Sequence, residues 1–280
     1  MGSLLAALAS WCDARHAGGV WRVRMEDLDP PREVPGAASD ILRTLEGFGL
    51  HWDGPVVYQS QRHEAYADAL SFLNQNNRAY GCACTRKSLQ GLAVYPGHCR
   101  QGLRAGESVR SHRFNWGSEE GEWTDAVQGR CRWDSKKMGD FVIKRADGHW
   151  AYQLAVVVDD LEQGVNAVVR GADLLDSTPK QLALRAALNT DAANIQWAHL
   201  PVLVNAEGQK LSKQTWASPV EPAQAPALLL EGLKVLGQMP SHEAQPQSLA
   251  DAGDVEGLLH WASQHWQLSR VPSASIQWQG

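Results

Sequence analysis

The sequence predicts an α/β fold in which helices alternate with the strands of a doubly wound parallel sheet. Helix-type and strand-type hydrophobic patterns alternate along the first eighty residues. The alternation stops over residues 82–139, where glycine, serine and charge accumulate, and this segment is expected to be an insertion. It resumes over 140–217, and residues 218–280 are rich in Pro, Ala and Leu with helical periodicity. We therefore expect four segments: 1–81, 82–139, 140–217 and 218–280.

The first segment begins with a predicted helix over Ser3–Ala14, since Leu4, Leu8 and Trp11 recur at i, i+4 and i+7. Trp21–Met25 then alternates like a strand. The further elements expected before the insertion are helices at Ala37–Phe48 and Glu64–Asn74 and a strand at Arg78–Cys82.

Only short strands, such as Arg130–Trp133, are expected inside the insertion. After the insertion, apolar runs predict a continuation of the sheet. The expected order is Phe141–Arg145, Tyr152–Asp159, Gly164–Arg170, a helix at Thr178–Leu188, a strand at Leu200–Val204, and helices at Ala225–Leu236 and Val255–Gln267.

The composition is that of an ordinary globular protein, with 44% hydrophobic and 20% charged residues in 280. No apolar run approaches the roughly 20 residues of a membrane span, and a signal peptide is not expected at the N-terminus, so we expect a cytoplasmic protein without a membrane partner. The net charge of -5 means that any nucleic acid must be bound by a local patch. Residues 100–145 carry ten Lys or Arg against seven acids, whereas those after Gln214 carry two against six.

Cys82-Ala83-Cys84 is followed by a third thiol, Cys99, within eighteen residues. Thiolates at this spacing can wrap one tetrahedral zinc ion, with His98 or Tyr95 as the fourth ligand. The alternative is three small buried thiols in a core, which we consider a poorer fit to this polar stretch. The remaining thiols, Cys12 and Cys131, are interpreted as packing residues.

The segment Lys210-Leu211-Ser212-Lys213-Gln214 follows the turn Asn205-Ala206-Glu207-Gly208. Two lysines flanking a serine make a cationic arm that could neutralise charge on polyphosphate oxygens. Alone the pattern is weak, because a solvated turn has the same composition.

Glu26, Asp27 and Asp29 lie at the carboxyl end of the expected strand Trp21–Met25, where open α/β sheets build ligand crevices. They could recognise an ammonium group, or cap the turn and helix that follow, and without other observations capping is the better interpretation. A metal on Asp27 and Asp29 would lack a third ligand nearby.

Arg170 ends another expected strand, and an arginine there can pair bidentately with a carboxylate. Tyr152 could present its hydroxyl to the same crevice. The simpler alternatives are an Arg170 paired with a neighbouring Asp and a Tyr152 half-buried in the sheet. With Glu26 and the lysine segment, these residues describe a site for ATP and an amino acid bearing an extra carboxylate.

Several segments resemble, in matching order, the glutamyl-queuosine tRNA(Asp) synthetase family, short relatives of class I glutamyl-tRNA synthetases. They are Arg24 to Ala37 with its Asp-Pro-Pro-Arg-Glu-Val-Pro core, the Cys-x-Cys with Tyr-x-x-x-Cys, Tyr152 to Asp160, Val169 to Leu175, and the lysine segment in place of a Lys-Met-Ser-Lys-Ser signature. The resemblance implies a Rossmann-like class I catalytic domain with a zinc-bearing insertion and a small C-terminal helical region.

The resemblance also implies an activity, which is ATP-dependent activation of glutamate and its transfer to the queuosine base of tRNA(Asp), with Mg²⁺ as helper. On that basis Glu26 would bind the ammonium of glutamate, and Tyr152 with Arg170 a carboxylate. The remaining implied contacts are ATP at Gly2, Ser3, Lys210, Ser212 and Lys213, with Lys213 and Lys210 catalytic, and structural zinc at Cys82, Cys84, Tyr95 and Cys99.

The chain departs from the family at its start, because Met1-Gly2-Ser3-Leu4 aligns with the end of a His-x-Gly-Ser signature and the histidine is absent. The family's first strand is absent as well. We expect either a longer native protein or a chain with weak or no activity. The rival functions are a 3′-charging glutamyl-tRNA synthetase fragment and a catalytically impaired, zinc-bearing tRNA-binding relative.

Overall fold

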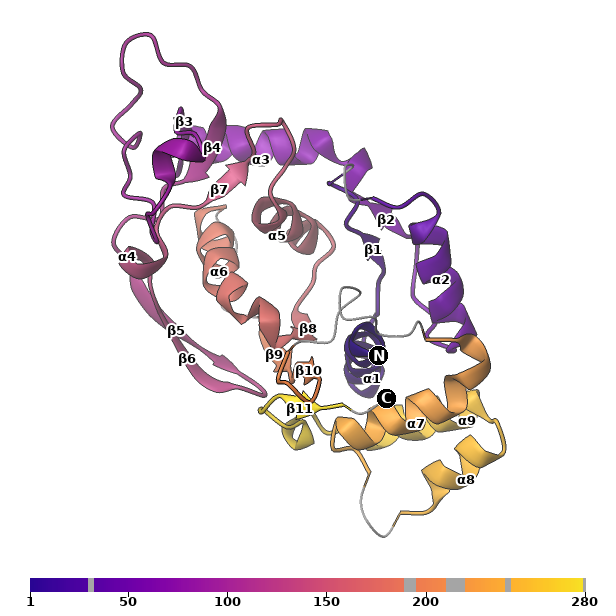
Figure 1. Ribbon diagram of the computed structural model, residues 1–280. Helices are drawn as coiled ribbons and strands as arrows, with labels where there is room; N and C mark the ends of the chain where they lie inside the picture. The colour runs from indigo at the N-terminus through magenta and orange to yellow at the C-terminus, as the bar shows by residue number, and fades with distance from the viewer. Residues whose placement is uncertain (30–32, 189–194, 210–219, 240–242, 279–280) are drawn as a thin grey trace.

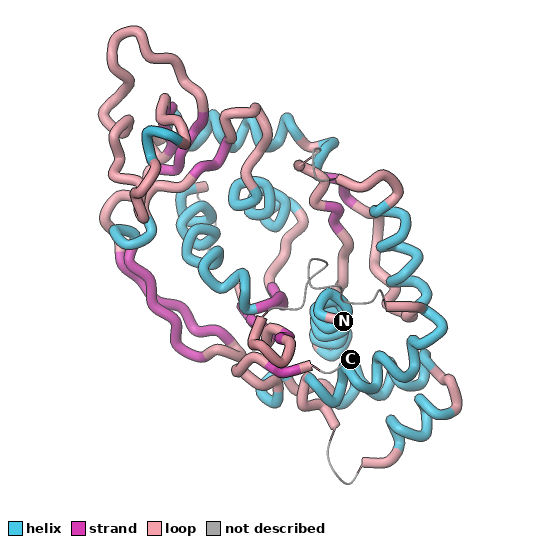
Figure 2. The backbone as a smooth tube through the Cα atoms, viewed as in Figure 1, coloured by secondary structure: helices cyan, strands magenta, loops and turns pink. Residues whose placement is uncertain are grey.

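A computed structural model of the chain describes residues 1–29, 33–188, 195–209, 220–239 and 243–278. Helices and strands alternate through most of it (Figures 1 and 2). The α-helices are α1 Gly2–His16, α2 Ala37–Gly47, α3 His63–Gln75, α4 Ser135–Met138, α5 Tyr152–Glu162, α6 Thr178–Ala187, α7 Ala225–Val235, α8 Gln245–Asp251 and α9 Val255–His265. The strands are β1 Arg24–Met25, β2 Val57–Tyr58, β3 Ala79–Cys82, β4 Ser111–Phe114, β5 Glu120–Asp125, β6 Gly129–Asp134, β7 Val142–Lys144, β8 Ala167–Gly171, β9 Gln196–Leu200, β10 Leu203–Val204 and β11 Ile276–Gln277.

The sheet that carries Arg170 has the strand order β6-β5-β9-β8. β8 and β9 are parallel, with Arg170 opposite His199. β5 joins β9 in parallel through Asp125 and Trp197, and β6 returns antiparallel beside β5. The β5–β6 hairpin of residues 82–139 therefore extends the sheet of β8 and β9. The four segment boundaries themselves stay a prediction.

Three smaller sheets complete the described part of the architecture. β1 pairs with β2 in parallel, and β10 pairs with β11 in parallel. β3, β4 and β7 form an antiparallel sheet that places Cys82 opposite Ser111. The α/β class is thus confirmed, and the fold contains an antiparallel sheet that hydrophobic alternation alone did not indicate.

Among the residues that the structure describes, two hydrophobic cores support these sheets. One joins α1 to the C-terminal helices α7 and α9, with Leu8 and Leu229 fully buried. The other lies among α3, α5 and α6 and includes the buried Tyr66, Leu154 and Leu184. Figure 1 shows α7, α8 and α9 gathered beside α1, away from α3 and β3.

Most expected helices are present within a residue or two of their predicted ends, but two expectations for strands were wrong. Tyr152–Glu162 is helix α5 and not a strand. Its apolar run Leu154–Val158 is buried on most sides, and so short a run cannot be assigned to helix or strand by periodicity. The expected strand Leu200–Val204 is divided between β9 and β10, because Pro201 has no amide hydrogen to donate to a ladder.

Among the described helices, none is both long and apolar enough to cross a bilayer.

Candidate active site and thiol cluster

Glu26, Tyr152 and Arg170 come from three different elements. Glu26 follows β1, Tyr152 is the first residue of α5, and Arg170 lies in β8. Arg170 Nη1 donates to the Tyr152 hydroxyl at 3.4 Å. The Glu26 carboxylate is close enough to act electrostatically on both other side chains. The fold therefore brings these three predicted site residues together, although 126 positions separate Glu26 from Tyr152 in the chain.

All five N–H donors of Arg170 have acceptors within the protein. Nε donates to His199 at 3.0 Å, and Nη1 donates to Gln181 at 2.9 Å in addition to Tyr152. Nη2 donates to Thr178 at 2.8 Å and to the Leu174 carbonyl at 3.3 Å. The bonds to Tyr152 and Leu174 are the longest of the five, so they are the weakest and the easiest to exchange for another acceptor.

The ionisation of these residues reflects a desolvated environment. Burial lowers the pKa of Arg170, with Tyr152 and Asp160 acting in the opposite direction. The pKa of Tyr152 is raised by burial and then by the negative charge of Glu26. Desolvation also raises the pKa of Glu26, while Arg24 opposes the rise from 3.6 Å. Because 44% of the Glu26 side chain remains accessible to solvent, we regard it as ionised at neutral pH.

A buried ionic network fixes β1 against α5. Arg24 of β1 donates to Asp160 at 2.9 Å and to Gln163 at 2.8 Å. Asp159, which is fully buried, accepts from Arg62 at 2.6 Å. The remaining donors to Asp159 are Gln59 Nε2 at 2.7 Å and the Tyr66 hydroxyl at 2.9 Å. This network sets the position of the segment that carries Glu26 relative to the helix that carries Tyr152.

The two acids that follow Glu26 have separate partners. Asp27 accepts from the backbone amide and the hydroxyl of Ser60, at 2.8 and 2.6 Å, and so caps a distant turn. Asp29 lies 3.4 Å from Arg145. Within the described part of the chain, neither belongs to a group of three metal-ligating side chains. Pro30, Pro31 and Arg32 fall outside the described residues.

The expected ATP contacts are only partly within the described structure. Gly2 and Ser3 form the exposed first turn of α1, and a side chain at Gly2 would meet open space. The turn before the lysine segment is closed by Asn205, whose side chain accepts from the Gln209 amide at 2.8 Å. Lys210, Ser212 and Lys213 lie outside the described residues.

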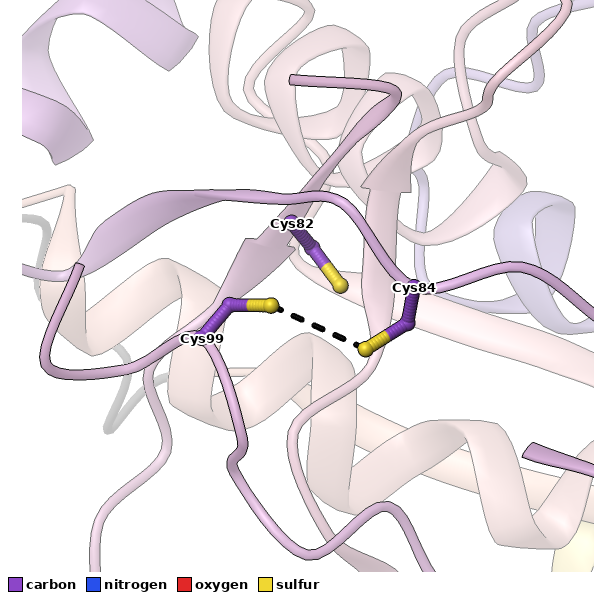
Figure 3. A group of neighbouring side chains, drawn as sticks. All are labelled: Cys82, Cys84 and Cys99. Carbon is purple, nitrogen blue, oxygen red and sulfur yellow. Dashed lines mark hydrogen bonds between the residues drawn. The ribbon is translucent and has the colours of Figure 1, made fainter. Parts of the chain in front are cut away.

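Cys82, Cys84 and Cys99, which we call the thiol cluster, point toward one another (Figure 3). Their sulfur atoms all lie within 4.8 Å of one another, and Cys84 and Cys99 are 3.7 Å apart. A tetrahedral zinc with Zn–S bonds of about 2.3 Å separates its sulfurs by about 3.8 Å. The spacing and the chemistry of this donor set therefore fit a zinc ion.

The Tyr95 hydroxyl completes the cluster on one side. It lies 3.5 Å from Cys82 Sγ and 3.9 Å from Cys84 Sγ, and it accepts from the Cys99 amide at 3.0 Å. The exposed His98 ring is not in the group of neighbouring ligand atoms that the described residues form. Of the two fourth ligands considered, the phenol is the one against the thiols.

Arg113 of β4 contacts both Cys82 of the cluster and Tyr95. Its Nε donates to Cys82 Sγ at 3.4 Å and its guanidinium lies 3.8 Å from the Tyr95 ring centroid. Burial works to raise the pKa of Cys82, but hydrogen bonds from Tyr95, the backbone and Arg113 outweigh it and lower that pKa to about 7. Burial and its sulfur neighbours raise the pKa of Cys84 to about 11. The site thus favours one thiolate before any metal binds.

A basic cavity of about 680 Å³ lies beside the thiol cluster. Five cationic side chains and Asp147 are among the residues that line it, whereas Glu26, Tyr152 and Arg170 are not. The cations are Arg86, Lys87, Arg110, Arg113 and Arg145. In a chain of net charge -5, this is a local concentration of positive charge.

The sequence interpretation missed the side chains behind Arg170, which are His199, Thr178, Gln181 and Asp125. The available signal was His199 itself, a titratable residue inside the otherwise apolar run Trp197–Leu200. A polar residue in a buried strand needs a partner, and the sequence does not reveal which one.

Known proteins resemble this chain over nearly its whole length. The family described as "tRNA synthetases class I (E and Q), catalytic domain" matches residues 1–245. A glutamyl-Q tRNA(Asp) synthetase from Chromobacterium violaceum is 53% identical, covering 99% of this chain and 92% of the relative. That of Dechloromonas aromatica is 50% identical, covering 98% and 92%.

A solved structure, the glutamate-tRNA synthetase from Elizabethkingia anophelis, has the same fold, with a TM-score of 0.81 at 23% identity. The match covers 99% of this chain and 65% of that one, so the chain spans about two thirds of the solved protein. On the strength of the family match and the curated relatives, the chain belongs to the class I tRNA synthetases of the E and Q type, alongside the glutamyl-Q tRNA(Asp) synthetases.

Proposed function

We propose that the chain activates glutamate with ATP and transfers it to the queuosine base of tRNA(Asp) in the cytoplasm. The observation that carries the proposal is the convergence of Glu26, Tyr152 and Arg170 in a chain 53% identical to a glutamyl-Q tRNA(Asp) synthetase. A carboxylate, a phenol and a guanidinium form a complementary set for an amino acid with an acidic side chain.

In this site the Glu26 carboxylate binds the ammonium group of glutamate. Arg170 and Tyr152 bind one carboxylate, which is the side-chain one, since the other must stay free to react. That carboxylate replaces the two longest bonds of Arg170, those to Tyr152 and the Leu174 carbonyl. Glutamine, which has no negative charge to offer the guanidinium, binds less well.

Activation is in-line attack by the free carboxylate oxygen on the α-phosphorus of ATP. Pyrophosphate leaves as the bond between the α-phosphorus and the oxygen that bridges it to the β-phosphate breaks. The first turn of α1, with Gly2 and Ser3, faces the nucleotide. Lys213, assisted by Lys210 and Ser212, neutralises the charge that develops on pyrophosphate. Class I synthetases use ATP with Mg²⁺, so positioning and charge neutralisation supply most of the rate.

We further propose that Cys82, Cys84, Tyr95 and Cys99 hold a structural zinc ion. Three thiolates and a phenol leave no open coordination position, which is typical of structural sites. The cavity beside them offers Arg86, Lys87 and Arg110, all exposed cations, to the phosphates of the RNA. The RNA thus contacts a local basic surface of an otherwise acidic protein.

Periodate-treated tRNA tests the proposal. Periodate destroys the 3′-terminal diol, so an enzyme that charges the 3′ end loses its substrate. An enzyme that modifies the base keeps its substrate, provided that queuosine is protected during the oxidation or introduced after it. We expect glutamate-dependent pyrophosphate exchange and label transfer to queuosine-containing tRNA(Asp) whose 3′ end is blocked. Transfer that needs an intact 3′ end would favour the 3′-charging alternative. No exchange at all would favour a tRNA-binding protein without catalysis.

A further inference from the structure

Asp125, His199 and Arg170 form a hydrogen-bonded row across three neighbouring strands. Asp125 ends β5, His199 lies in β9 and Arg170 lies in β8. Asp125 Oδ2 is 2.5 Å from His199 Nδ1, and His199 Nε2 is 3.0 Å from Arg170 Nε. The row runs from the β5–β6 hairpin directly to the guanidinium of Arg170.

The donor at one end determines the tautomer of the imidazole. An arginine Nε–H can only donate, so His199 Nε2 must accept. The ring proton therefore sits on Nδ1 and is donated to Asp125. Thr178 lies beside the same nitrogen, because its hydroxyl accepts from Arg170 Nη2 at 2.8 Å and its oxygen is 3.1 Å from His199 Nε2.

The row is sealed from solvent, so no water can replace a missing partner. Asp125 is 1% exposed, and His199 and Thr178 are fully buried. The second oxygen of Asp125 accepts from the backbone amides of Val127 at 3.0 Å, Gln128 at 2.9 Å and His199 at 3.1 Å. These amides fix the carboxylate, and the carboxylate fixes the ring. A mismatch of donor against donor inside such a network is costly.

We propose that Asp125 and His199 are positioning residues that aim the guanidinium of Arg170 at its carboxylate ligand. The inference rests on the proposed function, in which Arg170 binds glutamate. With Nε held by His199, the plane of the guanidinium has one orientation, and its Nη edge presents the two weakly bound hydrogens to the ligand. The β5–β6 hairpin thereby acts on the amino-acid site without touching the substrate.

The substitution Asp125→Asn tests this role because it changes the proton pattern and preserves the shape. Three backbone amides hold the side-chain oxygen in its place, so the new NH₂ group faces His199 Nδ1 and donates to it. The ring then carries its proton on Nε2, opposite the Nε–H of Arg170. Where a carboxylate holds a histidine in one tautomer, replacing it with a neutral amide can lower the reaction rate strongly.

Two readouts follow the change. Nitrogen-15 spectra of the ring report which nitrogen of His199 is protonated, and the signal among the ten histidines is identified by its loss in His199→Gln. Glutamate-dependent pyrophosphate exchange reports KM for glutamate and for ATP. Asp134→Asn is the matched control, since Asp134 lies in the same hairpin and accepts from the Lys136 amide at 2.9 Å without contacting His199.

We expect the Nδ1–H tautomer in the natural protein and the Nε2–H tautomer in Asp125→Asn. We expect KM for glutamate to rise about 10- to 100-fold, with KM for ATP within twofold, and no change in the control. If Asp125→Asn does not fold, His199→Gln decides, because its amide can donate to Asp125 and accept from Arg170. It should then keep KM for glutamate within about threefold of the natural value, and a larger rise would overturn the role.

Two results would overturn the inference, namely an Nε2–H tautomer in the natural protein, or a switched tautomer in Asp125→Asn with KM for glutamate unchanged. A natural protein that exchanges no pyrophosphate with glutamate contradicts the proposed function instead. In that case the tautomers still decide whether Asp125 and His199 orient Arg170.

Discussion

The Arg170 site and the thiol cluster are both polar groups enclosed by protein, yet they differ in what completes them. Every donor of Arg170 has a protein acceptor, so that site is assembled before any ligand arrives. The thiol cluster holds three sulfurs together with one phenol, and thiols are poor hydrogen-bonding partners for one another. One site is organised by the fold, whereas we propose that a zinc ion completes the other. Changes to the first should therefore alter ligand binding, and changes to the second should alter stability.

The largest effect is expected for Arg170→Lys. An ammonium cannot reproduce a planar fork that meets His199, Thr178 and a carboxylate together. We expect kcat/KM for glutamate to fall by about 100- to 1,000-fold, which is roughly 3–4 kcal/mol of transition-state stabilisation. Pyrophosphate exchange measures it. Arg130→Lys is the control, because Arg130 pairs with Glu122 on the exposed hairpin. A fall of less than threefold in Arg170→Lys would contradict its role.

The next largest effect is expected for Asp159→Asn, which tests whether the fold organises the site through buried charge. Removing one partner of a buried ion pair costs about 3–5 kcal/mol. We expect the free energy of unfolding in urea to fall by about 3 kcal/mol, since Arg62 would lose its fully buried partner and keep only the exposed Glu162. Glu162→Gln is the control, because Glu162 is 58% exposed in its pairing with the same Arg62. Equal effects of the two variants would show that burial is not decisive here.

A smaller effect on stability is expected for Cys84→Ser. The substitution removes one thiolate from the proposed zinc site, and metal binding is coupled to folding. We expect loss of bound zinc, measured by atomic emission, and about 2 kcal/mol lower stability, with KM for glutamate unchanged. A chelator should reproduce this in the natural protein and do nothing further to the variant. Cys131→Ser, outside the cluster, should retain the metal, and loss of zinc from it would contradict the assignment.

The smallest effects are expected for Arg86→Gln, Lys87→Gln and Arg110→Gln. These exposed cations line the cavity beside the thiol cluster. Each should raise KM for tRNA about three- to tenfold and reduce the salt dependence of binding by roughly one phosphate contact. Exchange of pyrophosphate without tRNA should stay the same. Glu107→Gln on the same loop is a control of equal size, and a change in pyrophosphate exchange in any of the three would place them elsewhere in the reaction.

The helices and the thiol cluster were largely predictable from sequence, because both depend on the spacing of nearby residues. Periodicity located α1, α2, α3 and α6 nearly to their ends, because each repeats apolar residues at helical spacing. The thiols were found because their spacing is specific. Tyr152 was placed in the wrong kind of element, since Leu154–Val158 is a continuous apolar run.

Asp125 and His199 could not be paired from sequence for a different reason. They are 74 positions apart and meet only because β5 is added to the edge of β9. Nothing local records that strand order. The roles of Lys210, Ser212 and Lys213 stay predictions, because these residues lie outside the described structure.

The pairing of β10 with β11 has a practical consequence. Ile276 donates to the Val202 carbonyl at 3.0 Å and Trp278 to that of Val204 at 2.9 Å, so the end of the chain braces the strand that leads to the lysine segment. An affinity tag fused after Gly280 would begin two residues from that ladder. Purification handles are better attached through a long spacer, and a clipped C-terminus in a preparation should be checked by mass before its kinetics are interpreted.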